Sequence, residues 1–192
     1  MEKQDLTNSI NTIEQAIQEA RKVPNGAYFY DILWGTILAI YYLLNYFSLS
    51  NPDAFISNFN HYYWVLFPIG GIVSAIRSKQ DDRRETAKSL ADKIYLFAYS
   101  GFAFAFITLC LSAGFNGYNA IIIPVFCSLL GLTVFVTGGI VKESLSIVMG
   151  LFGMLVGAYM LNMDVSHQYL FASLVSVMVS IIPGIKMKLS RV

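Results

Sequence analysis

The chain has 192 residues, of which 56% are hydrophobic, 15% aromatic and only 13% charged. This composition is too apolar for an ordinary soluble domain, and a net charge of +1 gives no basis for nucleic-acid binding. We therefore expect an integral membrane protein whose main partner is the lipid bilayer.

Residues 1–25 are too polar for a secretory signal peptide, so we expect them to remain on the mature protein. They are predicted to form a cytoplasmic amphipathic helix. Leu6, Ile10, Ile13 and Ile17 recur at spacings of four, three and four, which places them on one stripe of a helix. The opposite face lacks the Lys and Arg enrichment that favours anionic lipid heads. Two interpretations stay open: packing on the protein's own cytoplasmic surface, or docking of a cytoplasmic protein or a second copy.

Residues 26–192 contain six hydrophobic stretches, each close to the roughly 20 residues that a transmembrane helix needs. The predicted fold is all-α: an integral membrane six-helix bundle made of three helical hairpins, preceded by the amphipathic helix. The predicted spans are Ala27–Ser48, His61–Arg77, Ile94–Ala113, Asn119–Ile140, Ser144–Met163 and Gln168–Ile185.

The Lys and Arg residues predict the orientation of this bundle. All 13 lie before the first span, in the loop 77–93, at Lys142, or after the sixth span, and an even number of spans separates each group from the next. The alternate loops contain none. By the positive-inside rule, both termini and the loop 77–93 are expected on the cytoplasmic side of a bacterial inner membrane. Arg83 and Arg84 in this loop are a candidate docking surface for a cytoplasmic partner, although the loop also fits a solvated helix that continues into the third span.

Glycines near the cytoplasmic ends of the spans suggest a repeat. Spans two, four and six end on Gly70-Gly71, Gly138-Gly139 and Pro183-Gly184, which is weak evidence for three related hairpins. Free use of glycine wherever membrane helices approach would give the same pattern. The residues assigned to helix packing or kinking are Pro68, Gly70, Gly71, Gly139 and Gly184, with Pro68 expected to remove a backbone donor in mid span.

A short set of motifs resembles a known group of proteins. Trp34-Gly35, Trp64-x3-Pro68-Ile-Gly-Gly-Ile72 and the Lys/Arg loop that follows are similar to those of small, uncharacterised six-span bacterial membrane proteins of the Bacteroidota type. The resemblance covers mostly residues 26–102. It implies the six-span topology and brings no activity, cofactor or catalytic residue.

Asp31 is the one ionisable residue clearly inside a predicted span, about one turn from its cytoplasmic end. An intramembrane carboxylate is by default a candidate proton or cation site. A structural interpretation is also open, since an Asp near a helix amino terminus is stabilised by the helix dipole and by interfacial water. Ser74 and Ser100 complete the candidate intramembrane polar site.

The remaining chemistry-bearing residues predict no catalytic, cofactor or metal site. His61 and His167 fall at the outer ends of spans and fit solvated interface residues, and Cys110 and Cys127 fit small apolar side chains within the membrane. None of the common nucleotide, hydrolase or metal motifs occurs in the sequence. The predicted function is a non-enzymatic sensor, accessory or partner-binding subunit. The alternative is a small ion- or proton-coupled transporter or channel.

Overall fold

The computed structural model describes residues 8–15, 17, 26–53, 55, 62–82, 90–117 and 119–189, and within them the regular structure is entirely helical. Residues 8–15 and 17 are helical and are followed by a bundle. Its helices are α2 (Ala27–Ser50), α3 (Leu66–Asp82), α4 (Leu90–Asn116), α5 (Ile122–Val141), α6 (Ser144–Met160), α7 (Val165–Ser176) and α8 (Ile182–Leu189), with short turns η2 (Asn119–Ile121) and η3 (Val177–Ile181).

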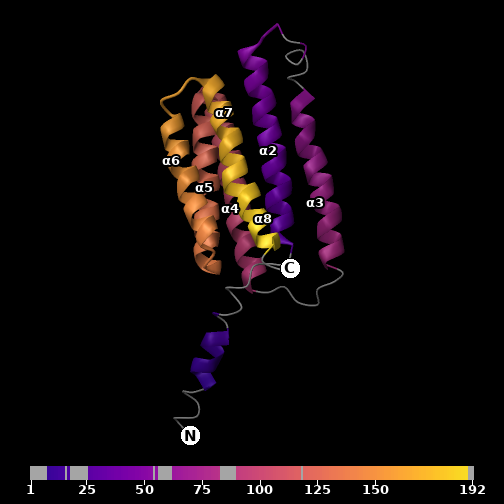
Figure 1. Ribbon diagram of the computed structural model, residues 1–192, viewed down its shortest axis with the longest axis vertical. Helices are drawn as coiled ribbons and strands as arrows, with labels where there is room; N and C mark the ends of the chain where they lie inside the picture. Colours follow the sequence, from indigo (N-terminus) through magenta and orange to yellow (C-terminus); the bar gives the residue numbers. More distant parts are fainter. Residues whose placement is uncertain are drawn as a thin grey trace.

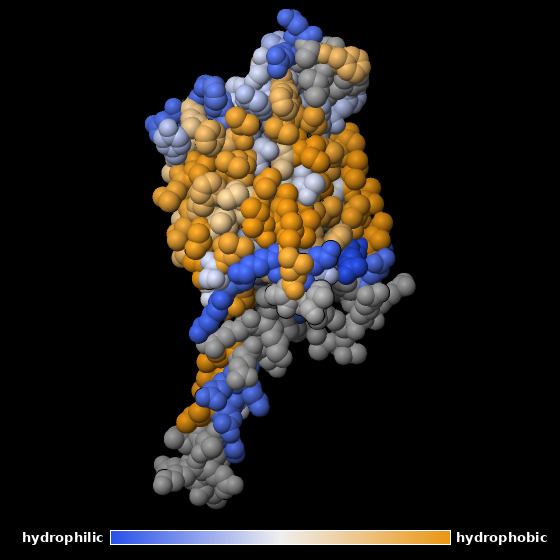
Figure 2. Space-filling model, viewed as in Figure 1, coloured by the Kyte–Doolittle hydropathy of each residue, from blue (hydrophilic) through white to orange (hydrophobic). Residues whose placement is uncertain are grey.

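Successive helices run in alternating directions, and α7, η3 and α8 form one continuous rod (Figure 1). On the face that Figure 2 shows, an apolar band covers the middle of the bundle, with hydrophilic residues above and below it. Among the described residues, four helical stretches are long and apolar enough to cross a membrane: Ala27–Ser50, Asp92–Ala113, Ile122–Val141 and Val165–Leu189. The all-helical class and the apolar bundle are thus confirmed.

Helices α5 and α6 pack backbone against backbone, because glycines line both sides of their contact. A Cβ added at Gly131 would lie 2.7 Å from the carbonyl oxygen of Gly150, and one at Gly150 would lie 2.7 Å from that of Gly131. A Cβ at Gly157 would lie 2.7 Å from the carbonyl oxygen of Pro124. Small residues permit such close approach between helices in lipid, where hydrophobic burial gives little drive for association.

Aromatic rings join the other helices to this pair. The ring of Phe126 on α5 lies 4.7 Å from Phe106 on α4 and 6.0 Å from Tyr42 on α2, measured between centroids. Tyr41, next to Tyr42, packs edge-on at 5.1 Å against Phe67 of α3. A line of aromatic contacts therefore reaches through the core from α4 across α5 and α2 to α3.

Two of the predicted packing glycines face neighbouring helices and two do not. A side chain at Gly70 would meet Cδ1 of Ile37, and one at Gly184 would lie 2.8 Å from Cγ1 of Ile32. Gly71 and Gly139 have nothing within 4 Å of an added Cβ. The packing role predicted for Gly71 and Gly139 is therefore wrong within this chain, because both project away from the bundle.

The kink predicted at Pro68 stays a prediction. Pro68 is the third residue of α3, which continues directly from a 3-10 turn at residues 62–65, and Pro124 is the third residue of α5, which continues directly from η2. At both places the backbone changes from 3-10 to α-helical within a few residues of the proline, whose ring removes one backbone donor. A further irregular turn, the π-helical η3, ends two residues before Pro183 and lies against Gly35 of α2, where a Cβ would be 2.8 Å from Cβ of Ser180.

The amino-terminal helical segment stands away from the bundle (Figure 1). Ile10, Ile13 and Ile17 are 51%, 59% and 44% exposed, so the expected packing of this stripe on the protein's own surface is not found among the described residues. Three other docking candidates, Leu6, Arg83 and Arg84, lie outside the described residues.

The hairpin repeat stays a prediction. The closest helix pair, α5 and α6, joins the second predicted hairpin to the third, whereas helices within one hairpin, such as α2 and α3, meet through side chains. The observed packing therefore does not follow the predicted hairpin boundaries.

The glycine contact between α5 and α6 should dominate stability. Gly150→Leu is expected to lower the free energy of unfolding by about 3 kcal/mol or more, because the new side chain meets the α5 backbone, which cannot move aside as a side chain would. Gly139→Leu, the matched control on open space, should leave it nearly unchanged. Thermal unfolding in detergent micelles measures both, and equal stability of the two variants would contradict the assigned contact.

Candidate functional site

Asp31 and Tyr99 form the clearest polar contact inside the apolar part of the bundle. Asp31 lies in the second turn of α2, and the hydroxyl of Tyr99 on α4 donates a hydrogen bond of 2.8 Å to its Oδ1. The two residues are 68 positions apart in the sequence. The carboxylate is therefore held at a crossing of helices and does not point freely toward the membrane surface.

A third helix lies beside this pair. A Cβ added at Gly184 of α8 would lie 3.3 Å from Cβ of Asp31, so the α8 backbone passes close to the base of this side chain. Tyr95, one turn before Tyr99, stacks on it with ring centroids 6.0 Å apart, and Tyr95 belongs to a buried cluster with Ala27. A carboxylate held between helices can bind a proton or a small cation, and the phenol fixes its position.

The other two members of the predicted polar site do not join Asp31. The hydroxyl of Ser100 donates to the carbonyl oxygen of Phe97 at 3.1 Å and is exposed. The hydroxyl of Ser74 on α3 is buried without a hydrogen-bond partner in the described part of the chain. The sequence reasoning missed Tyr99. Its signal was the pair of tyrosines one helical turn apart at the start of an otherwise apolar span.

Several other hydroxyl groups within the described bundle bond to the backbone of their own helix. Ser128 donates to the carbonyl oxygen of Pro124 at 3.1 Å, Thr133 to that of Leu129 at 2.9 Å and Ser176 to that of Ala172 at 2.8 Å. Ser173 differs, because it donates at 3.0 Å to Ala39 across the contact between α7 and α2. Hydroxyls satisfied in this way add little polarity to the spaces between helices.

An ion pair connects the α5–α6 turn with α8 at the same end of the bundle as Asp31. Glu143 caps α6 by accepting from the backbone N–H of Ser146 at 2.5 Å, and its other oxygen lies 2.6 Å from Nζ of Lys186. Partial burial raises the pKa of Glu143, but the hydrogen bonds from Lys186 and Ser146 outweigh burial and leave this pKa below its usual value. Glu143 is therefore charged at neutral pH.

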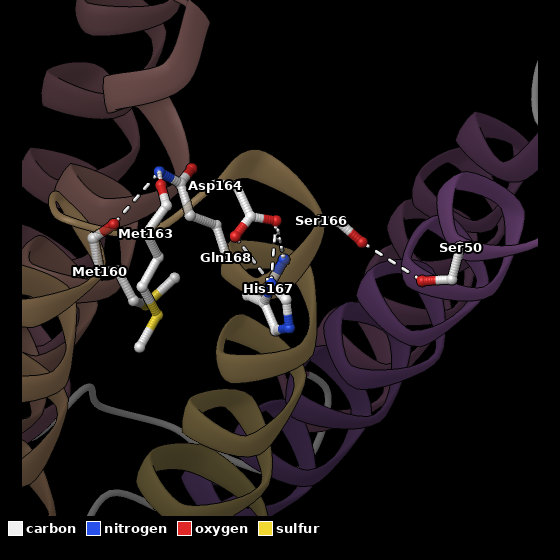
Figure 3. Close-up of polar contacts among 7 residues, drawn as sticks. All are labelled: Ser50, Met160, Met163, Asp164, Ser166, His167 and Gln168. Carbon is white, nitrogen blue, oxygen red and sulfur yellow. Dashed lines mark hydrogen bonds and ion pairs between the residues drawn. The ribbon is translucent and has the colours of Figure 1, made fainter.

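Figure 3 shows the polar contacts at the opposite end, where α6 turns into α7. The exposed Asp164 caps α7 and lies 2.8 Å from Nδ1 of His167, a contact that lowers the pKa of Asp164. The buried amide of Gln168 donates to the carbonyl oxygens of Met160 and Met163 at 3.2 and 3.1 Å. The Gln168 contacts connect the carboxyl-terminal end of α6 to α7.

Candidate metal ligands do not gather in the part of the chain that the structure describes, where no group of three or more His, Cys, Asp or Glu occurs. Cys110 and Cys127 are both free thiols, and Cys127 is fully buried in the core. His61 lies outside the described residues, so its predicted place at a span end is untested.

No protein-family model, curated protein or solved structure matches this chain. The resemblance to small Bacteroidota membrane proteins therefore stays a prediction. The case for a function rests on the bundle and on the placement of its side chains.

Proposed function

We propose that this chain is a non-enzymatic integral membrane protein that crosses a bacterial inner membrane six times and binds another membrane-embedded protein as an accessory subunit. The observation that carries the proposal is an unpartnered seam along α4. Phe97, Phe104 and Leu111 on this seam are 75%, 75% and 57% exposed.

The spacing of this seam suits a partner helix. Phe97, Gly101, Phe104, Thr108, Leu111 and Phe115 recur at alternating intervals of four and three residues. This is the period at which one helix packs lengthwise on another. Gly101 has nothing within 4 Å of an added Cβ, so it leaves a notch between two large rings. Small residues beside large ones are the usual contact of helices in lipid.

The bundle crosses the membrane six times if the short helices α3 and α6 lie at the same depth as their longer neighbours α2 and α5. Helix α6 has 17 residues, or about 25 Å, and touches α5 at Gly131, Gly138 and Pro124, near the middle and both ends of α5. Helix α3 and the 3-10 turn at residues 62–65 before it run along α2, from Trp64 beside Tyr41 to Arg77 over the ring of Phe29. Helices packed along such lengths must lie at the same level of the membrane.

The charges support cytoplasmic termini. Six of the Lys and Arg residues lie in described parts of the bundle, and all belong to helix ends or turns at the end where α2 begins and α8 ends (Figure 1). These are Arg77, Lys79, Lys93, Lys142, Lys186 and Lys188. Cationic residues concentrate on the cytoplasmic side of membrane proteins.

The six-span topology predicts which side of the membrane a probe can reach. In intact cells, a membrane-impermeant thiol reagent should label Val165→Cys, at the outer start of α7, and should not label Lys142→Cys until the membrane is permeabilised. Both variants are made with Cys110 and Cys127 replaced by alanine. Labelling of position 142 but not of position 165 would invert the topology.

The accessory role predicts contact at the α4 seam. A photo-crosslinking amino acid at Phe104 should capture a specific membrane protein in cells, whereas the same group at Val136, an exposed position on α5, should not. Gly101→Leu should abolish the crosslink because it fills the notch, while thermal stability stays within about 0.5 kcal/mol of wild type, as expected for an exposed position. Equal crosslinking at 104 and 136 would refute the proposed interface.

A proton- or cation-coupled transporter is the second candidate, and the Asp31–Tyr99 contact is the observation that favours it. A carboxylate held between three helices is a common element of such pathways. The transporter is the weaker candidate because the hydroxyls of Ser128, Thr133 and Ser176 bond to their own helices and so do not extend a polar path from Asp31.

Flux measurements separate the two candidates. For an accessory protein, proteoliposomes with purified protein should show no proton or sodium flux above empty vesicles. For a transporter, they should show a flux that Asp31→Asn abolishes and Tyr99→Phe reduces. A flux that Asp31→Asn removes, with thermal stability retained, would replace the accessory role with the transporter.

A further inference from the structure

The amino-terminal helical segment carries an apolar face that the rest of the described chain does not cover. Ile10, Ile13 and Ile17 stand on one side of it, and all three are exposed. Asn8 and Gln15 lie on the opposite side, by the 3.6-residue period of the helix. The segment is therefore amphipathic, with an apolar stripe made of these three isoleucines.

The exposed isoleucine stripe favours a surface that buries it. Fully burying a large aliphatic side chain is worth about 1.5–3 kcal/mol relative to leaving it in water. Ile10, Ile13 and Ile17 together therefore give the segment a strong drive toward an apolar surface.

The chain length restricts which surface that is. Eight residues, 18–25, join Ile17 to Gly26, the residue directly before α2. Whatever their conformation, they span no more than about 30 Å. The segment emerges from the end of the bundle that carries the Lys and Arg residues (Figure 1). With the bundle in a membrane, the headgroup layer around that end is always within reach of the stripe.

We propose that residues 8–17 lie on the cytoplasmic membrane surface as an interfacial helix, with Ile10, Ile13 and Ile17 in the boundary between headgroups and acyl chains. This inference depends on the membrane placement of the bundle and not on its accessory role. A lipid surface is a better occupant than a second copy, because the tether keeps it at high effective concentration. A coiled coil of two heptads, in contrast, would need high protein concentration.

Hydrophobic burial, more than charge, holds this helix to lipid. Between residues 8 and 17, Glu14 is the single ionisable residue, and the nearest cations, Arg21 and Lys22, follow in the connecting segment. Amphipathic helices that depend on anionic lipid carry Lys and Arg on the polar face. Binding should therefore persist in zwitterionic vesicles and change little with salt.

The test uses an environment-sensitive fluorophore on single cysteines in the full chain, reconstituted in phosphatidylcholine vesicles with and without a lipid quencher near the headgroups. Cys110 and Cys127 are replaced by alanine. Ile13→Cys should give blue-shifted emission that the lipid quenches about twofold, whereas Gln15→Cys on the opposite face should be quenched much less. Ile10→Asp together with Ile17→Asp should abolish quenching at position 13.

Each possible result either supports or refutes the interfacial helix. Phe104→Cys, on the α4 seam that faces lipid when the chain is reconstituted without its partner, serves as the control for membrane placement with a quencher deep in the acyl chains. Quenching at 104 without quenching at 13 would overturn the interfacial helix alone, and loss of both would overturn the membrane placement as well. Blue-shifted emission at 13 that lipid does not quench would assign the stripe to a protein surface and would also refute the proposal.

Discussion

The backbone contact between α5 and α6 is the constraint on which the bundle depends. Gly131, Gly150 and Gly157 let two helices meet without intervening side chains, so their main-chain atoms set the distance and leave no freedom to repack. In lipid, where apolar surface gains little by leaving the solvent, such close van der Waals contact is the main source of helix association. Helices α2, α4 and α7 then add to this rigid pair through aromatic and aliphatic side chains, and α3 packs on α2.

Polar groups within the bundle follow from the same absence of water. A hydroxyl that has no solvent must find an acceptor, and the carbonyl oxygen one turn back is always available, as for Thr133 and Ser176. Asp31 has no comparable local solution, because a carboxylate in a helix needs a donor from outside it. Tyr99 supplies that donor, which makes the pair a tie between α2 and α4 whatever its further role.

Much of the fold could be predicted from the sequence, because apolar runs and charged interruptions determine where helices enter and leave lipid. The predicted Ser144–Met163 became α6 at Ser144–Met160, and the predicted Ala27–Ser48 became α2 at Ala27–Ser50. The facing of individual residues could not be predicted in the same way. Gly71 and Gly139 project outward although adjacent Gly70 and Gly138 project inward, since neighbours on a helix differ by about 100°.

The candidate site could also be predicted from the sequence only in part. The sequence placed Asp31 within a span near its cytoplasmic end, but a partner 68 residues away has no local signature in one sequence. The contact of α5 and α6 could also have been predicted from the sequence. Gly150, Gly153 and Gly157 recur at intervals of three and four on one helix, which is the pattern of a packing face.

The π-helical turn η3 resolves a conflict of period in the last helix. Buried pairs recur there every four residues, at Val175-Ser176, Val179-Ser180 and Pro183-Gly184. In a regular α-helix a four-residue repeat advances by about 40° at each step, so the third pair would rotate away from α2 by about 80°. A wider turn slows that rotation and keeps Ser180 and Gly184 on the α2 side. The extra residue thus sets the phase of α8, which in turn brings Gly184 to Asp31 and Lys186 to Glu143.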